Sequence, residues 1–270
     1  MKPDSVPASI RYVCNICKQA NELPAVKFHR ELGQCTRCGS TPRFRGLMYA
    51  LSLALFDKNM ALPDFPARKD LRGVGISDWG GYAAPLEKKL SYQNTFFHCE
   101  PRLDITDPAS TARVNNLDFL ICSDVLEHVL PPVLNPLMNV FKMLKPSGSL
   151  ILTVPYCQRH GTLEHYKALH KYAVLDFMGR KIVVNERKDG GGLDVYDHAV
   201  LHGGDGTTLE MRLFSEGDLL RDLRAAGFGS IKIYSEPVLE SGYYWPELNE
   251  RLEMNQHPLL GYVIEARSGK

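Results

Sequence analysis

The sequence of 270 residues lacks any long hydrophobic run. No apolar stretch reaches the roughly 18 residues that a membrane-spanning helix needs, and residues 1–10 lack the apolar core of a signal peptide. We therefore expect a cytoplasmic protein that makes no contact with a membrane.

The sequence also has little net charge. Its 32 lysines and arginines nearly balance 31 aspartates and glutamates, which leaves a formal charge of +1 at pH 7. A strong, non-specific hold on nucleic acid needs a basic surface, so this balance argues against nucleic acid as a partner without excluding a local basic patch. Hydrophobic residues make up 44% of the chain, and at this length they allow one large domain and a small one.

Cysteines are few but unevenly placed. Four of the seven form two Cys-x-x-Cys pairs, Cys14 with Cys17 and Cys35 with Cys38. Two such pairs can hold one zinc ion, and a closed site with four sulfurs is structural because no position remains for water. Two redox dithiols or plain buried cysteines are the alternatives. The other three are expected in the core, in or beside strands: Cys99, Cys122 and Cys157.

Basic residues cluster around the cysteine pairs. Such a cluster predicts either a solvated face or a surface that holds an anionic substrate, phosphate or RNA. We expect residues 1–45 to form a zinc-ribbon module, and residues 46–270 to form the main domain, beginning with a helix over 46–61. The cluster comprises Lys27, His29, Arg30, Arg37, Arg43 and Arg45.

Residues 117–156 predict a strand, a helix and a second strand. The continuous apolar run at 117–122 is typical of a strand buried on both faces, and a second run follows at 149–154. Between them, apolar residues recur at helical spacing up to the stop at Lys145, Pro146 and Gly148. This is one crossover of a parallel sheet, in which ligands lie beyond the carboxyl ends of the strands.

The string DVLEHV at residues 124–129, followed by LKPSG at 144–148, resembles the later motifs of class I S-adenosylmethionine-dependent methyltransferases. The resemblance extends over residues 71–267. It implies an α/β fold with a doubly wound, Rossmann-like sheet, mostly parallel with an antiparallel last strand. It further implies S-adenosyl-L-methionine as cofactor. With the zinc ribbon added, we expect O-methylation of a small-molecule, sugar or glycan-type acceptor.

Residues 71–82 predict a strand, a glycine turn and the start of a helix. Glycine lets the backbone approach a ligand closely, and a helix start offers N–H groups. The turn departs from known fingerprints, since Asp78 stands where the dinucleotide motif has its last glycine. A serine-hydrolase elbow would need a closing glycine where Trp79 stands. The expected cofactor contacts are Gly75, Ser77, Trp79 and Gly80.

An acidic residue, Glu100, follows the next predicted strand at 95–99, and its oxygens could accept from both ribose hydroxyls. The resemblance implies that Glu100 binds the ribose and Asp104 the adenine, with Ile105 packing on the ring. A helix and a strand usually separate those two acids, so either the sheet is short by one unit or one assignment is wrong. Surface acids in a proline-rich loop are the alternative. Ser123 and Asp124 would border the methionine part.

Residues 156–213 are expected to form a substrate-side insertion or lid, with a hairpin around a strand at 181–185. Histidine suits the task of a base near neutral pH, and we expect the base among His128, His165 and His202. Structural roles, a second metal, and simple capping by residues 127 and 128 are the alternatives. The residues expected to contact substrate or orient a histidine are Tyr156, Glu164, Glu210 and Arg212.

The last third predicts a helix at 215–226 and closing strands at 230–234 and 262–266, the final one antiparallel. The aromatic tract at 243–246 is either the floor of an acceptor site or a packing corner. The rival function is an RNA-directed methyltransferase or an RNA-binding module that uses the zinc ribbon. The sequence gives no indication of the oligomeric state.

Overall fold

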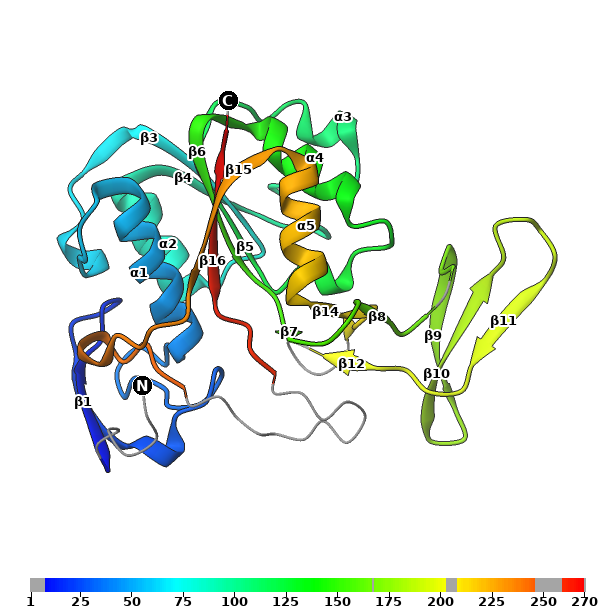
Figure 1. Ribbon diagram of the computed structural model, residues 1–270, viewed down its shortest axis with the longest axis horizontal. Coiled ribbons are helices and arrows are strands. Elements are labelled where there is room, and N and C mark those ends of the chain that lie inside the picture. The colour runs from blue at the N-terminus through cyan, green and yellow to red at the C-terminus, as the bar shows by residue number, and fades with distance from the viewer. Residues whose placement is uncertain (1–7, 167, 203–207, 246–258, 270) are drawn as a thin grey trace.

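A six-stranded sheet forms the centre of the molecule (Figure 1), with the strand order β15-β16-β6-β5-β3-β4. The computed structural model describes residues 8–166, 168–202, 208–245 and 259–269, and it places residue 202 by its backbone only. The strands of the sheet are β3 (Arg68–Ile76), β4 (Leu90–Thr95), β5 (Leu117–Ser123), β6 (Leu144–Thr153), β15 (Phe228–Tyr234) and β16 (Val263–Ser268).

The pairing within the sheet has the expected directions. Strands β4, β3, β5 and β6 are parallel neighbours, whereas β16 runs antiparallel to both β6 and β15. The predicted fold, doubly wound and mostly parallel with an antiparallel last strand, is confirmed.

Helices cover both faces of the sheet, which explains the continuous apolar run in β5. Phe119 and Ile121 face the helices α1 and α2, and Leu120 and Cys122 face α4 and α5. The helices α2, α4 and α5 each bury one apolar stripe, as an amphipathic surface helix does, whereas α1 is buried on most sides. The four are α1 (Pro42–Phe56), α2 (Gly80–Lys89), α4 (Leu134–Met143) and α5 (Glu216–Ala226).

The sheet lacks one helix-and-strand unit between β4 and β5. This is one of the two explanations that the sequence left open for the short spacing between Glu100 and Asp104. Residues 96–116 are all described and contribute the helix α3 (Pro108–Thr111) but no strand of the sheet. The strand predicted at 95–99 is wrong, because β4 ends at Thr95 and Phe97 is 48% exposed. Cys99 is likewise exposed and not a core residue, whereas Cys122 and Cys157 are buried as expected.

The N-terminal module packs on the body through its first helix and an aromatic corner. Its hairpin joins β1 (Ser9–Val13) to β2 (Ala20–Pro24), and α1 begins at Pro42, with the Thr41 hydroxyl accepting from the Phe44 amide, earlier than predicted. The Arg45 guanidinium, completely buried, donates to the carbonyls of Gly33 and Gly242. Tyr244 meets Phe28 of the module, so the described part of the tract at 243–246 is a packing corner.

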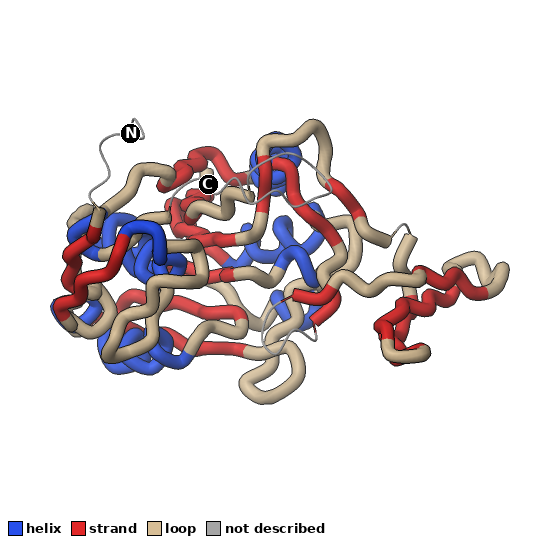
Figure 2. The backbone as a smooth tube through the Cα atoms, turned by 90° about the horizontal axis from the view of Figure 1, so that it is seen from below, coloured by secondary structure: helices blue, strands red, loops and turns tan. Residues whose placement is uncertain are grey.

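The insertion after β6 contains two small sheets and a projecting arm. We call β9, β10 and β11, residues 171–196, the arm, because they form a three-stranded meander that extends away from the central sheet in Figures 1 and 2. The hairpin predicted around 181–185 is part of it. The strands are β7 (Tyr156–Cys157), β8 (Leu163–Glu164), β9 (Lys171–Phe177), β10 (Arg180–Glu186), β11 (Leu193–Tyr196), β12 (Leu201–His202), β13 (Thr208–Leu209) and β14 (Arg212–Ser215).

Four short 3-10 helices complete the described elements: η2 (Ala25–Lys27), η3 (Leu62–Asp64), η4 (Leu126–His128) and η5 (Leu239–Ser241). Within the described ranges, no helix combines the length and apolar character that crossing a membrane requires.

Candidate active site and metal centre

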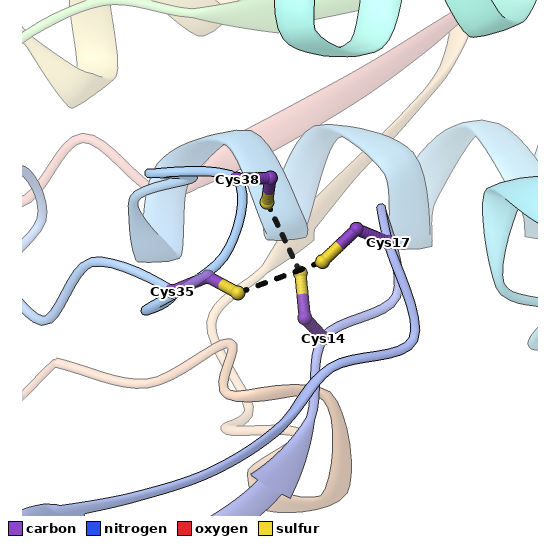
Figure 3. A group of neighbouring side chains, drawn as sticks. All are labelled: Cys14, Cys17, Cys35 and Cys38. Atoms are coloured by element: carbon purple, nitrogen blue, oxygen red, sulfur yellow. Dashed lines mark hydrogen bonds between the residues drawn. The ribbon is translucent and has the colours of Figure 1, made fainter.

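The four paired cysteines meet around one point (Figure 3). Cys14 Sγ lies 3.8 Å from Cys38 Sγ, Cys17 Sγ lies 3.6 Å from Cys35 Sγ, and all four sulfurs lie within 4.8 Å of one another. Zinc bonded tetrahedrally to four sulfurs at about 2.3 Å would separate them by about 3.8 Å. The four sulfurs therefore fit a zinc ion, and the two knuckles contribute equally to the site.

Two arginines of the N-terminal module reach the carboxyl end of β5. Arg30 donates to both carboxylate oxygens of Asp124, over 2.7 Å to Oδ2 and 2.5 Å to Oδ1. Arg43 donates to the Ser123 hydroxyl, and its Nε lies 3.3 Å from Asp124 Oδ2. Glu31 accepts from both guanidinium groups. The prediction of a solvated basic face is wrong for Arg30, Arg43 and Arg45, because burial and carboxylate or carbonyl partners hold them inside.

Asp124 is held in place from both sides of the strand end. Its amide donates to the Thr153 carbonyl over 2.9 Å, and Thr153 Oγ1 donates to its Oδ1 over 2.9 Å. Burial alone would raise the pKa of Asp124, but the guanidinium groups of Arg30 and Arg43 outweigh it and hold this pKa well below its usual range. A permanent carboxylate therefore marks the end of β5.

The glycine turn after β3 contains a buried acid that sequence reasoning noticed only as a departure from a motif. The Asp78 carboxyl is buried and accepts from the Tyr92 hydroxyl over 2.5 Å. A Cβ at position 75 would collide with both groups, so Gly75 is required by this pair. Burial raises the pKa of Asp78 to about 7. The sequence did carry a sign of this buried acid, because Asp78 stands where the dinucleotide-binding motif has its last glycine.

The other expected contacts in the turn lie nearer the surface. Ser77 is exposed, has φ 56°, and donates its amide to the Thr95 carbonyl over 2.7 Å. The Trp79 ring stacks on Phe44 of α1, with the ring centres 4.8 Å apart. Gly80 begins α2, and nothing lies within 4 Å of where its Cβ would be. The start of α2 is therefore open to a ligand.

The acids after β4 are at the surface. Glu100 is exposed, and one of its oxygens accepts from the Arg102 amide. Asp104 accepts from the Thr106 amide and hydroxyl. Ile105 lies in the hydrophobic core at 4% exposure, so the expectation that it covers an adenine ring is corrected.

Two histidine-bearing segments lie side by side directly after Asp124, joined through Met211. The short helix η4 carries His128, and the Met211 amide donates to the Glu127 carbonyl over 2.8 Å, which ties η4 to the chain before β14. The His165 amide in turn donates to the Met211 carbonyl over 2.9 Å. Backbone bonds through Met211 therefore bring the chain at His165 beside η4.

The hydrogen bonds of these histidines fix their proton positions. His128 Nδ1 lies 2.8 Å from the Leu209 carbonyl, which only accepts, so Nδ1 carries the proton and Nε2 the lone pair in the neutral ring. His165 Nε2 lies 3.0 Å from a Glu210 carboxylate oxygen and donates to it. Glu210 thus orients a histidine, which was one of its two expected roles. Both rings have the tautomer of a base in which one nitrogen is anchored.

Glu127 is the residue that sequence reasoning undervalued, since it was given only a packing role. Its side chain is completely buried, and burial together with the nearby Asp124 carboxylate raises its pKa well above the usual range. The sequence did offer a sign of this role, because Glu127 lies between two candidate site residues, Asp124 and His128, in the string DVLEHV. A buried acid whose Oε1 lies 3.9 Å from His128 Nε2 is a group able to hold or move a proton.

Three of the expected substrate residues have structural contacts: Arg212, Glu164 and Tyr156. Arg212 is 1% exposed and donates to Glu164 over 2.7 Å and to the carbonyls of Leu126 and Val129 over 2.8 and 2.6 Å. It clamps η4 against β14, and the Glu164 carboxylate is its ion-pair partner. Tyr156 is completely buried in the core. The His202 side chain lies outside the described residues.

The strand order places the glycine turn and Asp124 at neighbouring strand ends. From β3 the chain continues to β4 on one side of the sheet, and β5 lies on the other side of β3. Ligands of open α/β sheets bind at such a switch point, outside the carboxyl ends of the strands. The glycine turn after β3 and Asp124 after β5 flank it.

Comparisons with known proteins give only distant likenesses. No protein-family model matches the chain, and no curated protein matches it. Among solved structures, the N-terminal domain of EvdMO1 with SAH bound is 12% identical over 85% of this chain and 82% of its own, with a TM-score of 0.44.

Two further solved structures are similar. An S-adenosylmethionine-dependent methyltransferase from Clostridium acetobutylicum is 12% identical over 82% of this chain and 97% of its own, with a TM-score of 0.40. The 1,6-didemethyltoxoflavin-N1-methyltransferase of Burkholderia thailandensis is 15% identical over 86% of this chain and 92% of its own, with a TM-score of 0.39. At such values the function has to be argued from the residues of the site.

Proposed function

We propose that the protein is an S-adenosylmethionine-dependent methyltransferase that methylates an oxygen of a small-molecule, sugar or glycan-type acceptor. One observation carries the proposal. The glycine turn and Asp124 flank the switch point of the sheet, and the histidine-bearing helix η4 follows Asp124 at once. A ligand site and candidate bases therefore adjoin, as group transfer requires.

Side chains that follow β4 and side chains beside the end of β5 suit the parts of this cofactor. The carboxylates of Glu100 and Asp104 can accept from ribose hydroxyls and an adenine amino group. The pair formed by Arg43 and Glu31, whose carboxylate is 39% exposed, offers both signs of charge to a zwitterionic amino-acid group. When bound, S-adenosylmethionine supplies an electrophilic methyl group on a good leaving group.

The protein's own residues would remove the acceptor's proton. His128 Nε2 and His165 Nδ1 carry the lone pairs of the neutral rings, and Leu209 and Glu210 hold those rings in orientation. A base near neutral pH contributes about 10² to 10⁴ in rate. His202 stays a third candidate.

The zinc ion would be structural, held by the four cysteines of the module with no open position. Its task would be to fix the segment that carries Arg30 and the helix start that carries Arg43. Burial of Arg30, Arg43 and Arg45 removes three of the six residues of the basic cluster from the surface, which counts against the RNA-directed alternative.

Calorimetry with S-adenosylhomocysteine on zinc-loaded protein tests the proposal. We expect binding, and we expect Glu100→Gln to weaken it by about tenfold, the value of a hydrogen bond to a charged group. Glu236→Gln, an exposed acid away from the switch point, is the matched control. Absence of binding by the wild-type protein would refute the proposal.

A further inference from the structure

Glu127 places a buried carboxyl beside the lone-pair nitrogen of a candidate base. Its side chain is completely buried, and its Oε1 lies 3.9 Å from His128 Nε2. The segment that carries it is held from outside: the Met211 amide donates to the Glu127 carbonyl over 2.8 Å, and Arg212 donates to two other carbonyls of the same segment. Glu127 is therefore fixed next to His128 and shielded from water.

Charged and titratable groups from several segments act on this carboxyl. Burial raises the pKa of Glu127 well above its usual range, the Asp124 carboxylate adds to this effect, and the Arg30 guanidinium opposes it. In the ligand-free protein Glu127 thus keeps its proton at pH values where an ordinary glutamate has lost it. The groups are Cys122 in β5, Asp124 after β5, His128 on η4, Glu210 and Arg212 at the start of β14, and Arg30 of the N-terminal module.

We propose that Glu127 is a reversible proton acceptor of the site: it releases its proton when a positive sulfur binds beyond β5, and it takes up the acceptor's proton through His128 during methyl transfer. The proposal rests on the proposed function, since it requires S-adenosylmethionine as the cofactor. A cation nearby favours the charged form of a carboxyl, whereas a neutral sulfur does not. Glu127 is therefore ionised beside the positive sulfur and protonated beside the neutral one.

The proton transfer balances in atoms and charge. An acceptor oxygen forms a bond to the methyl carbon while the carbon–sulfur bond breaks, and the electron pair of the broken bond stays on sulfur. The acceptor's proton passes to His128 Nε2 and then to the Glu127 carboxylate, which has to approach Nε2 by about 1 Å to reach hydrogen-bond distance. Because Nε2 faces Glu127, this route selects His128 over His165 as the base.

Two ligands that differ in the charge on sulfur test the proposal in titration calorimetry of the full-length, zinc-loaded chain at about pH 6.5. Each titration is repeated in Pipes and in imidazole buffer, because the change in binding heat with the ionisation enthalpy of the buffer counts the protons released. We expect S-adenosylmethionine to release about one proton more than S-adenosylhomocysteine. The α-amino groups of both ligands stay largely protonated at this pH, so they contribute little to the difference.

A second measurement needs no variant. If binding of S-adenosylmethionine releases a proton, its affinity should rise by up to about tenfold per pH unit between about pH 5.5 and 6.5. The affinity for S-adenosylhomocysteine should change less over the same range. A parallel pH dependence for the two ligands would contradict the proposal.

The variant Glu127→Gln keeps the shape of the protonated side chain but has no proton to release. It should bind S-adenosylhomocysteine with nearly the wild-type affinity, and the difference in proton release between the two ligands should disappear. Asp78→Asn and His128→Gln remove two other titratable side chains and should retain that difference. Circular dichroism verifies the fold of each variant.

Equal proton release with both ligands, at measurable affinity for each, overturns the proposal and leaves the proposed function standing. A difference that persists in Glu127→Gln, or that disappears in Asp78→Asn or His128→Gln, assigns the proton to another group and equally overturns it. A wild-type chain that binds neither ligand refutes the proposed function itself, and the role of Glu127 is then refuted with it.

Discussion

Arg30 and Asp124 lie 94 positions apart in the sequence and form a bidentate ion pair at the end of β5. The Arg30 side chain is 6% exposed and that of Asp124 is 11% exposed, so the pair is largely removed from water. Arg30 also donates through Nε to the Gly261 carbonyl over 3.1 Å. The N-terminal module therefore forms part of the candidate active site.

The first prediction concerns this pair. Arg30→Ala leaves the Asp124 carboxylate buried without its main partner, which costs about 3–5 kcal/mol in the free energy of unfolding. Urea denaturation measures it, and Arg37→Ala, an exposed arginine of the same module, is the control. Asp124→Asn in the Arg30→Ala background should recover part of the loss. A loss below about 1 kcal/mol would show that the pair contributes little.

The second prediction concerns the metal centre. Purified protein should contain about one zinc ion per chain, and Cys35→Ser should reduce that content and lower the melting temperature, because the knuckles depend on the ion for their fold. Since the module carries Arg30 and Arg43, affinity for S-adenosylhomocysteine should fall as well. Cys99→Ser, outside the cluster, should change neither quantity. Metal-free protein with full affinity would contradict the prediction.

The crossover from β5 to β6 could be predicted from sequence because its signals are local and strong. A run of apolar residues marks each strand, although β6 begins at Leu144 and includes residues 145–148, which were expected to stop the helix before the strand. The helix α5 was equally predictable from its caps, with Ser215 accepting at its start and Gly227 at φ 114° after its end. The strand β4 was misplaced because polar residues such as Gln93 and Asn94 give it no apolar run.

Long-range pairing was beyond such reasoning. Nothing near Arg30 in the sequence indicates that its partner is Asp124, and an arginine between two zinc knuckles is more commonly a surface residue. The same holds for Arg212, whose partners are backbone carbonyls of η4 rather than a substrate. Polar residues in a histidine-rich insertion suggest catalytic roles. Only the folded structure distinguishes residues such as Arg212, which hold two segments together, from histidines that are candidate bases.

The third prediction separates the histidines. If His128 or His165 is the base, its replacement by glutamine should lower kcat by about 10² to 10⁴ with little change in KM, since the group acts in the transition state. Glu210→Gln should lower kcat less, because it only orients His165. His160→Gln is the control, since that side chain is exposed. Equal turnover by all four variants would exclude His128 and His165 as the base and would leave His202 as the remaining candidate.

The fourth prediction uses the buried carboxyl of Asp78, whose pKa burial raises to about 7 from an ordinary value of 3.8. The folded chain then binds this proton more tightly than the unfolded chain does. Stability from this group is therefore greatest below pH 4 and falls as pH rises from about 4 to 7. A difference of about three pKa units corresponds to roughly 4 kcal/mol, an upper figure for a single buried group.

Asp78→Asn keeps an oxygen that accepts from Tyr92 but removes the titration. Urea denaturation between pH 5 and 8 should show stability falling with pH in the wild-type chain and a flatter profile in Asp78→Asn. The variant should be the more stable of the two at pH 8.

Asp124 stays ionised throughout this window, because its pKa is held low, so it does not contribute to the slope. Asp57→Asn, at an exposed left-handed position that asparagine tolerates, should retain the wild-type slope. Parallel profiles for wild type and Asp78→Asn would mean that this carboxyl is not protonated near neutral pH.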